Sequence, residues 1–197
     1  AIKPFIYAAA IDKGMTPATI IFDAPITYKA GADEEMWRPK NFENKFYGAT
    51  TLRTGLVLSR NVVTIKILNE IGLDYAITYL KRFDLQSTLP RDLSLALGSG
   101  VLTPFNLFRG YATFALYGSP FHPHLMESVV QGGKGTIFRA STGTPPPQEE
   151  GQITDTAGQQ IISAQTAFII TNILKDVVQD GTGWRAKALM RPVAGKT

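Results

Sequence analysis

The chain has 197 residues, of which 44% are hydrophobic and 18% charged, and a net charge of +4. This length and apolar content favour about one domain with a buried core, and they exclude a disordered or collagen-like chain. Because the chain has no cysteine, disulfides, cysteine-ligated zinc and a thiol nucleophile are excluded. Its basic residues are scattered rather than clustered, which argues against a nucleic-acid partner. No apolar run reaches the roughly 18 to 20 residues that a membrane span needs.

The first quarter of the chain predicts one helix followed by irregular segments. The helix covers residues 4–11, because its leading proline suits a first helical turn, and Gly14 ends it. Residues typical of β-strands follow over 20–28, where Pro25 interrupts them. Residues 37–42 have no regular pattern, so no element is assigned to them.

The next segment predicts three short helices. Thr50 or Thr51 can cap a helix that runs to about residue 58. Two further apolar runs, over 62–71 and 74–83, have helical spacing. Residues 59–61 therefore lie at a joint between two helices rather than inside one.

The second half of the chain predicts two longer helices, a hairpin and a loop, on the evidence of capping residues, glycine-rich turns and apolar spacing. In chain order, the elements expected here are a helix over 105–117 after Thr103 and Pro104, a hairpin over 124–140, an exposed loop over 141–158, a long helix over 163–181, a short helical piece over 182–189 and the beginning of a strand over 192–197.

Several isolated motifs fail when their spacing is examined. The ending Gly195–Thr197 resembles a phosphate-binding loop, but such a loop needs a glycine where Met190 stands. His122 and His124 have no nearby carboxylate cluster, so neither a metal site nor a cofactor is predicted. Ser99 lies between two glycines at the wrong spacing for a serine-hydrolase elbow.

Three separated fragments make chemical sense together. Lys3 opens the first helix, Ser59 and Asn61 lie at the helix joint, and Lys196 and Thr197 end the chain. Each has an ordinary alternative: a solvated lysine, a helix cap or a chain-end residue. In this order they match the S-x-x-K, S-x-N and K-T-G motifs of penicillin-binding proteins and class A β-lactamases.

The sequence around these motifs resembles the transpeptidase domain of bifunctional, class A penicillin-binding proteins over essentially the whole chain. The resemblance is carried by Ile2–Tyr7, Asp23–Ile26, Trp37–Phe42, Ser59–Thr64, Leu97–Pro104 and Gly181–Gly183. It implies an α+β, β-lactamase/transpeptidase-like fold, present here mainly as its helical part with a few short strands and hairpins and an incomplete central antiparallel sheet. We expect residues 1–197 to be a single incomplete domain that starts just after the nucleophilic serine and stops within the K-T-G motif.

The resemblance also implies a chemistry for the motif residues. Such domains cross-link peptidoglycan stem peptides through a serine acyl-enzyme, and β-lactams imitate the substrate. Lys3 would be the base, which requires a pKa roughly 3 units below the usual value of about 10.4. Ser59 would pass a proton to the leaving amine and Asn61 would hold Lys3 and the substrate amide. Lys196 and Thr197 would face the terminal carboxylate of the substrate.

Two parts of the family pattern are expected outside the given residues: the nucleophilic serine directly before Ala1, and a glycine directly after Thr197. We therefore expect the chain as given to be inactive. The resemblance implies a longer parent protein with a glycosyltransferase domain and a membrane anchor, located on the outer, periplasmic face of the cytoplasmic membrane of a bacterium. Its expected partners are stem peptides, β-lactams and other cell-wall synthesis proteins. A non-catalytic penicillin-recognising sensor of the same fold stays open as an alternative, and a secreted β-lactamase is disfavoured.

Overall fold

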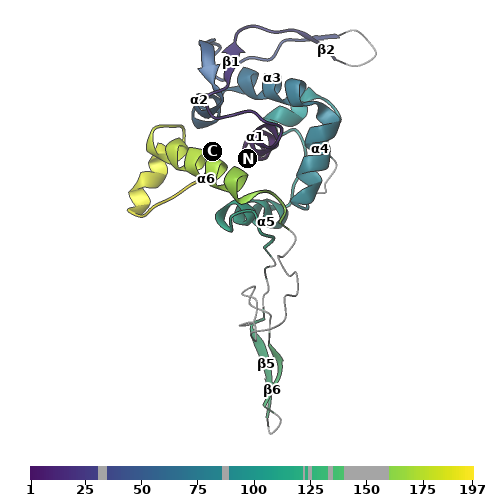
Figure 1. Ribbon diagram of the computed structural model, residues 1–197, viewed down its shortest axis with the longest axis vertical. Helices are drawn as coiled ribbons and strands as arrows, with labels where there is room; N and C mark the ends of the chain where they lie inside the picture. Colours follow the sequence, from purple (N-terminus) through teal and green to yellow (C-terminus); the bar gives the residue numbers. More distant parts are fainter. Residues whose placement is uncertain (31–34, 86–88, 122, 124–125, 133–134, 140–159) are drawn as a thin grey trace.

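The computed structural model describes residues 1–30, 35–85, 89–121, 123, 126–132, 135–139 and 160–197. Its helical body surrounds the first helix, and a two-stranded hairpin projects from one end of that body (Figure 1). The helices are α1 (Lys3–Asp12), α2 (Leu52–Val57), α3 (Asn61–Ile71), α4 (Leu73–Arg82), α5 (Pro104–Ala115) and α6 (Ala164–Gln179), with the 3-10 helices η1 (Leu93–Leu97) and η2 (Trp184–Leu189).

The described strands form three separate antiparallel pairs. They are β1 (Ile20–Asp23) with β4 (Gly48–Thr51), β2 (Tyr28–Ala30) with β3 (Glu35–Trp37), and β5 (Ser128–Gln131) with β6 (Gly135–Arg139). The expected fold class is confirmed: the chain is mostly helical, with short strands and no extended central sheet among the described residues.

Helix α1 is the centre of the core. All its residues from Lys3 to Ala10 are buried, because apolar side chains cover every face and α2, α3, α4 and α6 pack around it. Phe5 makes aromatic contacts with Phe83 and Phe114, with ring centroids 5.0 and 5.2 Å apart. A side chain at Gly110 would place its Cβ 2.8 Å from the Phe5 ring, so glycine allows α5 to approach this closely.

The expected helix starts are confirmed by side-chain caps. The hydroxyl of Thr51 accepts the Thr54 backbone N–H at 3.1 Å, and the Thr103 hydroxyl accepts that of Asn106 at 3.1 Å. Ser163 caps α6 in the same way. These bonds satisfy N–H groups that have no partner within the helix, which is why the boundaries lie close to those predicted.

The beginning of a strand expected over 192–197 is wrong. No strand is found there among the residues that the structure describes, and the backbone N–H of Gly195 donates instead to the carbonyl of Leu174 in α6, at 3.2 Å. A strand needs a neighbouring ladder, and the described residues offer none at this position. The predicted hairpin over 124–140 is confirmed in β5 and β6, whereas the loop over 141–158 lies outside the described residues.

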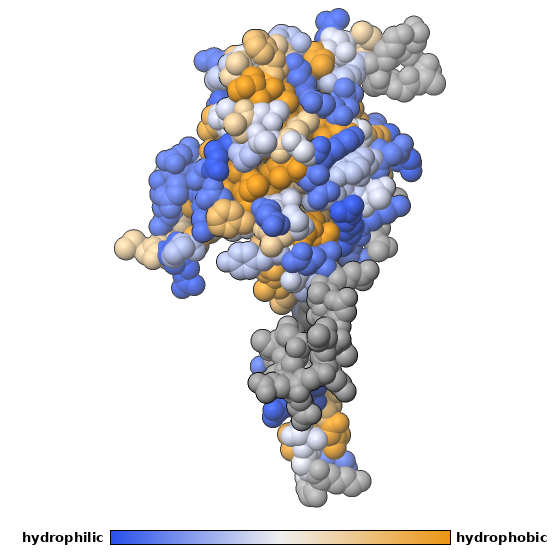
Figure 2. All heavy atoms as spheres, viewed as in Figure 1, coloured by the Kyte–Doolittle hydropathy of each residue, from blue (hydrophilic) through white to orange (hydrophobic). Residues whose placement is uncertain are grey.

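Both ends of the chain meet at one face of the body. In Figure 1 the termini lie close together between α1 and α6, and Figure 2 shows hydrophobic surface in the middle of this same face. The positive charge of Lys196 lowers the pKa of Lys3, which agrees with this proximity. The fold therefore brings the first and last motifs of the sequence to one place.

Candidate active site

The structure brings Lys3, Ser59 and Asn61 into direct contact. The Lys3 Nζ donates to the Ser59 backbone carbonyl at 2.8 Å, to the Asn61 Oδ1 at 2.7 Å and to the Ser59 Oγ at 3.2 Å. Lys3 is only 8% exposed, so the solvated-lysine alternative is excluded by its position. α1 supplies the amine, and the joint between α2 and α3 supplies all three acceptors.

Of the three hydrogen bonds that Lys3 makes, only one can exchange its donor and acceptor. A carbonyl and an amide oxygen can only accept, so they fix two of the amine's hydrogens on the Ser59 carbonyl and Asn61. The Ser59 hydroxyl can either accept or donate. When Lys3 is neutral, its lone pair can take the hydroxyl proton of Ser59 or of another alcohol, which is the geometry that proton transfer needs.

The pKa of Lys3 is lowered from 10.5 to about 7. Burial of the ammonium is the larger cause, and the positive charge of Lys196 is the second. Burial also lowers the pKa of Lys196 to about 8. Near neutral pH a large fraction of Lys3 is therefore the free amine, which is the form that can act as a base.

Lys196 and Thr197 form the opposite side of the site together with Thr182. The Lys196 Nζ donates to the Thr197 carbonyl at 2.8 Å and reaches the Thr197 Oγ1 at 3.3 Å. The hydroxyls of Thr182 and Thr197 are 2.7 Å apart. One ammonium with two adjacent hydroxyls is an arrangement that binds a carboxylate.

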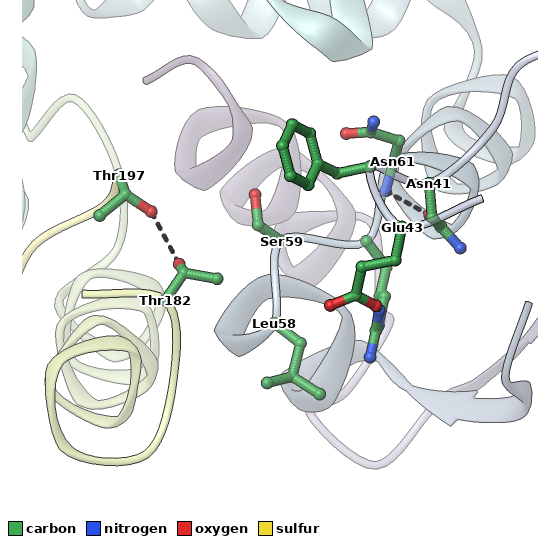
Figure 3. Close-up of a pocket in the computed structure, with 9 residues that line it drawn as sticks. Asn41, Glu43, Leu58, Ser59, Asn61, Thr182 and Thr197 are labelled. Atoms are coloured by element: carbon green, nitrogen blue, oxygen red, sulfur yellow. Dashed lines mark hydrogen bonds and ion pairs between the residues drawn. The ribbon is translucent and has the colours of Figure 1, made fainter. Parts of the chain in front are cut away.

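A cavity of about 310 Å³ lies between these two sides. Figure 3 shows Thr182 and Thr197 on one side of it, with Ser59 and Asn61 on the other. The residues that line it are Asn41, Phe42, Glu43, Leu58, Ser59, Arg60, Asn61, Thr182 and Thr197. The cavity is therefore lined by residues of both the second motif, Ser59 and Asn61, and the third motif, Thr197.

Ser59 occupies an uncommon backbone conformation. Its φ is +57°, in the left-handed region that residues other than glycine seldom adopt. The turn is held by two backbone bonds, from Ser59 N to the Leu56 carbonyl at 3.1 Å and from Arg60 N to the Gly55 carbonyl at 2.8 Å. This turn directs the Ser59 carbonyl and hydroxyl to Lys3, so strain is stored at a position of the site where geometry matters.

Two buried residues at the site, Asn41 and Asp23, have no individual role that could be identified from the sequence. Asn41 and Asp23 are 4% and 0% exposed and are hydrogen-bonded to each other. Both belong to fragments that carry the family resemblance, but their mutual contact has no local signal because 18 residues separate them. Thr182 likewise belongs to Gly181–Gly183, which carries the resemblance, but no local pattern indicates the contact of its hydroxyl with Thr197.

The described part of the chain offers no metal site: no three histidine, aspartate or glutamate side chains in it are grouped so that they could hold a metal ion. His122 and His124 lie outside the described residues. No helix in the described part of the chain is both long enough and apolar enough to cross a membrane.

Known proteins have similar sequences and a similar fold. The penicillin binding protein transpeptidase domain family matches residues 1–197. The chain is 35% identical to penicillin-binding protein 1A of Pseudomonas aeruginosa, covering 99% of this chain and 28% of that protein, and 39% identical to penicillin-binding protein 1A of Neisseria flavescens, covering 99% and 24%.

The fold agrees with these sequence matches. The crystal structure of penicillin-binding protein 1A from Haemophilus influenzae superimposes with a TM-score of 0.86 at 29% identity, covering 100% of this chain and 33% of that one. The chain thus spans between a quarter and a third of the length of these relatives. The chain belongs to the penicillin-binding protein transpeptidase domain family.

Proposed function

We propose that residues 1–197 supply most of the active site of a serine D,D-transpeptidase that cross-links peptidoglycan stem peptides and is acylated by β-lactams. The observation that carries the proposal is the buried amine of Lys3, 3.2 Å from the Ser59 hydroxyl and 2.7 Å from Asn61, with a pKa lowered to about 7. Few structural roles require a lysine to be buried beside a second lysine. A general base does require this environment, because burial and a neighbouring positive charge lower its pKa.

The nucleophile in this proposal is a serine directly before Ala1. Such a serine is three residues before Lys3, and this spacing puts both side chains on one face of α1. The free amine of Lys3 takes the serine proton as the oxygen attacks the carbonyl between the two terminal D-alanines.

The remaining steps use the same residues. The bond between the carbonyl carbon and the amide nitrogen breaks, and D-alanine leaves after its nitrogen receives a proton, which Lys3 returns through the Ser59 hydroxyl. An acceptor amine then attacks the acyl-enzyme and loses a proton to the site, which restores the serine. Asn61 holds the substrate amide throughout, and its Nδ2 is itself oriented by donation to the Lys40 carbonyl at 3.1 Å.

Substrate binding rests on Lys196, Thr197 and Thr182. A terminal carboxylate bound at Thr182 and Thr197, which line the cavity, would replace the bonds that these hydroxyls now make with each other and with the Lys196 ammonium. Charge-assisted bonds of this kind select an anionic substrate end, which D-alanyl-D-alanine and β-lactams share.

The parent assembly is part of the proposal. The single domain would be completed by residues beyond the given chain, and the parent would carry a glycosyltransferase domain and an anchor in the cytoplasmic membrane, facing the periplasm. It would meet stem peptides and other cell-wall synthesis proteins there.

The test separates an enzyme from a penicillin-recognising sensor. A longer polypeptide that contains these residues and a serine directly before Ala1 is given a stem pentapeptide ending in D-alanyl-D-alanine and an acceptor with a free amine. We expect release of D-alanine and a cross-linked product by mass spectrometry. Asn61→Ala should lower the rate of product formation by about 100-fold, whereas Asn69→Ala, an exposed position on the same helix, should not change it.

Two results would contradict the proposal. Penicillin binding without D-alanine release or cross-linking would support the sensor instead. Release of D-alanine that does not depend on the serine before Ala1 would place the chemistry elsewhere.

A further inference from the structure

A buried pair at the active site, Asp23 and Asn41, has no role in the proposed mechanism, although Asn41 lines the cavity. We propose that this pair is a positioning unit for the reaction: the Asp23 carboxylate fixes the Asn41 amide, and that amide holds the start of α3 so that Ser59 and Asn61 stay on Lys3. The inference rests on the proposed function for its catalytic consequence, but its structural part can be tested separately.

Asn41 caps a helix that lacks a cap of its own. Arg60 occupies the cap position of α3 and its side chain makes no capping bond. The Asn41 Oδ1 instead accepts the backbone N–H groups of Asn61 at 2.9 Å and Val62 at 3.2 Å. These are the first two N–H groups of α3, which have no partner inside the helix. A residue 20 positions away thus fixes the helix end that carries Asn61.

The amide of Asn41 can adopt only one orientation. Its Nδ2 donates to the Asp23 Oδ2 at 2.8 Å, to the Oδ1 at 3.0 Å and to the Lys45 carbonyl at 2.9 Å. A flipped amide would set its NH₂ against two backbone N–H donors and its oxygen against a carboxylate and a carbonyl. The donors and the acceptor of the Asn41 side-chain amide are therefore satisfied in this orientation alone.

Asp23 determines that orientation from a fully buried position at the end of β1. Besides Asn41, it accepts the backbone N–H of Tyr47 at 3.2 Å. Within the described part of the chain no lysine or arginine forms an ion pair with it. A buried carboxylate held only by N–H donors is costly unless those donors are fixed, which ties β1 and the loop around Asn41 into one unit.

The unit acts on the reaction through geometry. Ser59 has the left-handed φ of +57°, so the turn before α3 keeps its shape only while both its sides are held. Lys3 is bonded to acceptors that lie on this turn and one residue into α3. Displacing the start of α3 by an ångström would move these acceptors and the Ser59 hydroxyl away from the amine.

The experiment uses the longer polypeptide with a serine before Ala1. It compares two single variants with the double variant that combines them, called the exchange because it swaps the aspartate and the asparagine. In Asp23→Asn, an NH₂ group must face either Asn41 or the Tyr47 N–H. In Asn41→Asp, two carboxylates face each other. The exchange Asp23→Asn with Asn41→Asp restores an amide opposite a carboxylate and leaves oxygens for Tyr47 and for the start of α3. It does not replace the N–H that position 41 donates to the Lys45 carbonyl, so its recovery is expected to be partial.

We expect each single variant to lower the rate constant of acylation by a fluorescent penicillin by about 100-fold, with a smaller change in the binding constant. The exchange should recover at least about tenfold of that loss, a coupling that independent sites do not show. The two single variants change the local charge in opposite directions, so a purely electrostatic effect on Lys3 would move the rate in opposite directions. Asn69→Asp, with the same chemical change on the exposed side of α3, should leave the rate unchanged.

A second measurement does not depend on acylation. In the longer polypeptide with a serine before Ala1, kept free of penicillin, the ¹³C shift of the Lys3 Cε should change in both single variants and return in the exchange. The positioning role would be overturned if the losses of acylation rate in the two single variants simply multiplied in the exchange. An unchanged Lys3 signal would overturn it as well. A wild-type polypeptide that is not acylated at all would contradict the proposed function, and the Lys3 signal would still decide whether the pair positions the site.

Discussion

The lowered pKa of Lys3 makes the stability of the fold depend on pH in a specific direction. Unfolding returns Lys3 to a pKa of 10.5, whereas the folded value is about 7. Between these values the unfolded chain binds a proton that the folded chain does not, so the free energy of unfolding rises with pH. The penalty from Lys3 is complete below pH 7 and disappears as the pH approaches 10.5.

The size of the effect follows from the two pKa values. A shift of about 3.5 units corresponds to roughly 5 kcal/mol, of which about 2 kcal/mol is regained between pH 7 and pH 9. Lys3 is 8% exposed, so solvent screening reduces this little. Lys196 contributes in the same direction but less, because its side chain is partly exposed. Burial also raises the pKa of several tyrosines, which lowers stability only near and above pH 10; these are Tyr7, Tyr75, Tyr79 and Tyr111.

Urea unfolding followed by circular dichroism measures this dependence. In Lys3→Met, which keeps the length of the side chain and removes its charge, the rise between pH 7 and pH 9 should be smaller than in the wild type by about 2 kcal/mol. Lys81→Met, at an exposed position near the end of α4, is the matched control and should keep the wild-type rise. Equal pH dependence in wild type and Lys3→Met would refute the claim that folding deprotonates Lys3.

Three further predictions use other parts of the structure. Lys196→Met removes the positive charge near Lys3, so the acid limb of the pH profile of acylation should move to higher pH; no movement, or a shift to lower pH, would contradict the role of that charge. Gly118→Ala should lower the thermal stability strongly, because φ is +93° and the new Cβ would lie 2.1 Å from the Ile162 carbonyl oxygen, and an unchanged melting temperature would exclude this packing. Ser163→Ala should lower the free energy of unfolding by about 1 kcal/mol in a urea titration through loss of the α6 cap; a change below about 0.3 kcal/mol would show that this cap contributes little.

Local sequence was enough to predict most helices. α2, α5 and α6 begin at threonine or serine caps, and each cap forms the bond expected of it. The strand β4 escaped prediction because Gly48–Thr51 has no alternating apolar pattern and is held by pairing with β1. The 3-10 helix η1 was missed for the same reason, since packing against α3 and α1, rather than local propensity, supports its five residues.

The candidate site was predictable only in part. Its motif residues could be identified because their order and spacing match a family, and the structure then brought Lys3, Ser59 and Asn61 together. The contact of Asp23 with Asn41 depends on how β1 meets the loop before β4, and no local pattern specifies a contact of that kind. The same holds for the strained turn at Ser59. Its positive φ could not be predicted, because the residue is a serine and not the glycine that usually marks such a conformation.

Catalysis by this site depends on Lys3 activating a serine directly before Ala1. The most direct measurement is the mass of peptides from a longer polypeptide with that serine, after reaction with a fluorescent penicillin. We predict one adduct, on the serine before Ala1, whose rate of formation falls by at least about 100-fold in Lys3→Met and rises with pH through about 7 in the wild type. An adduct on another residue, or equal rates with and without the Lys3 amine, would contradict the claim.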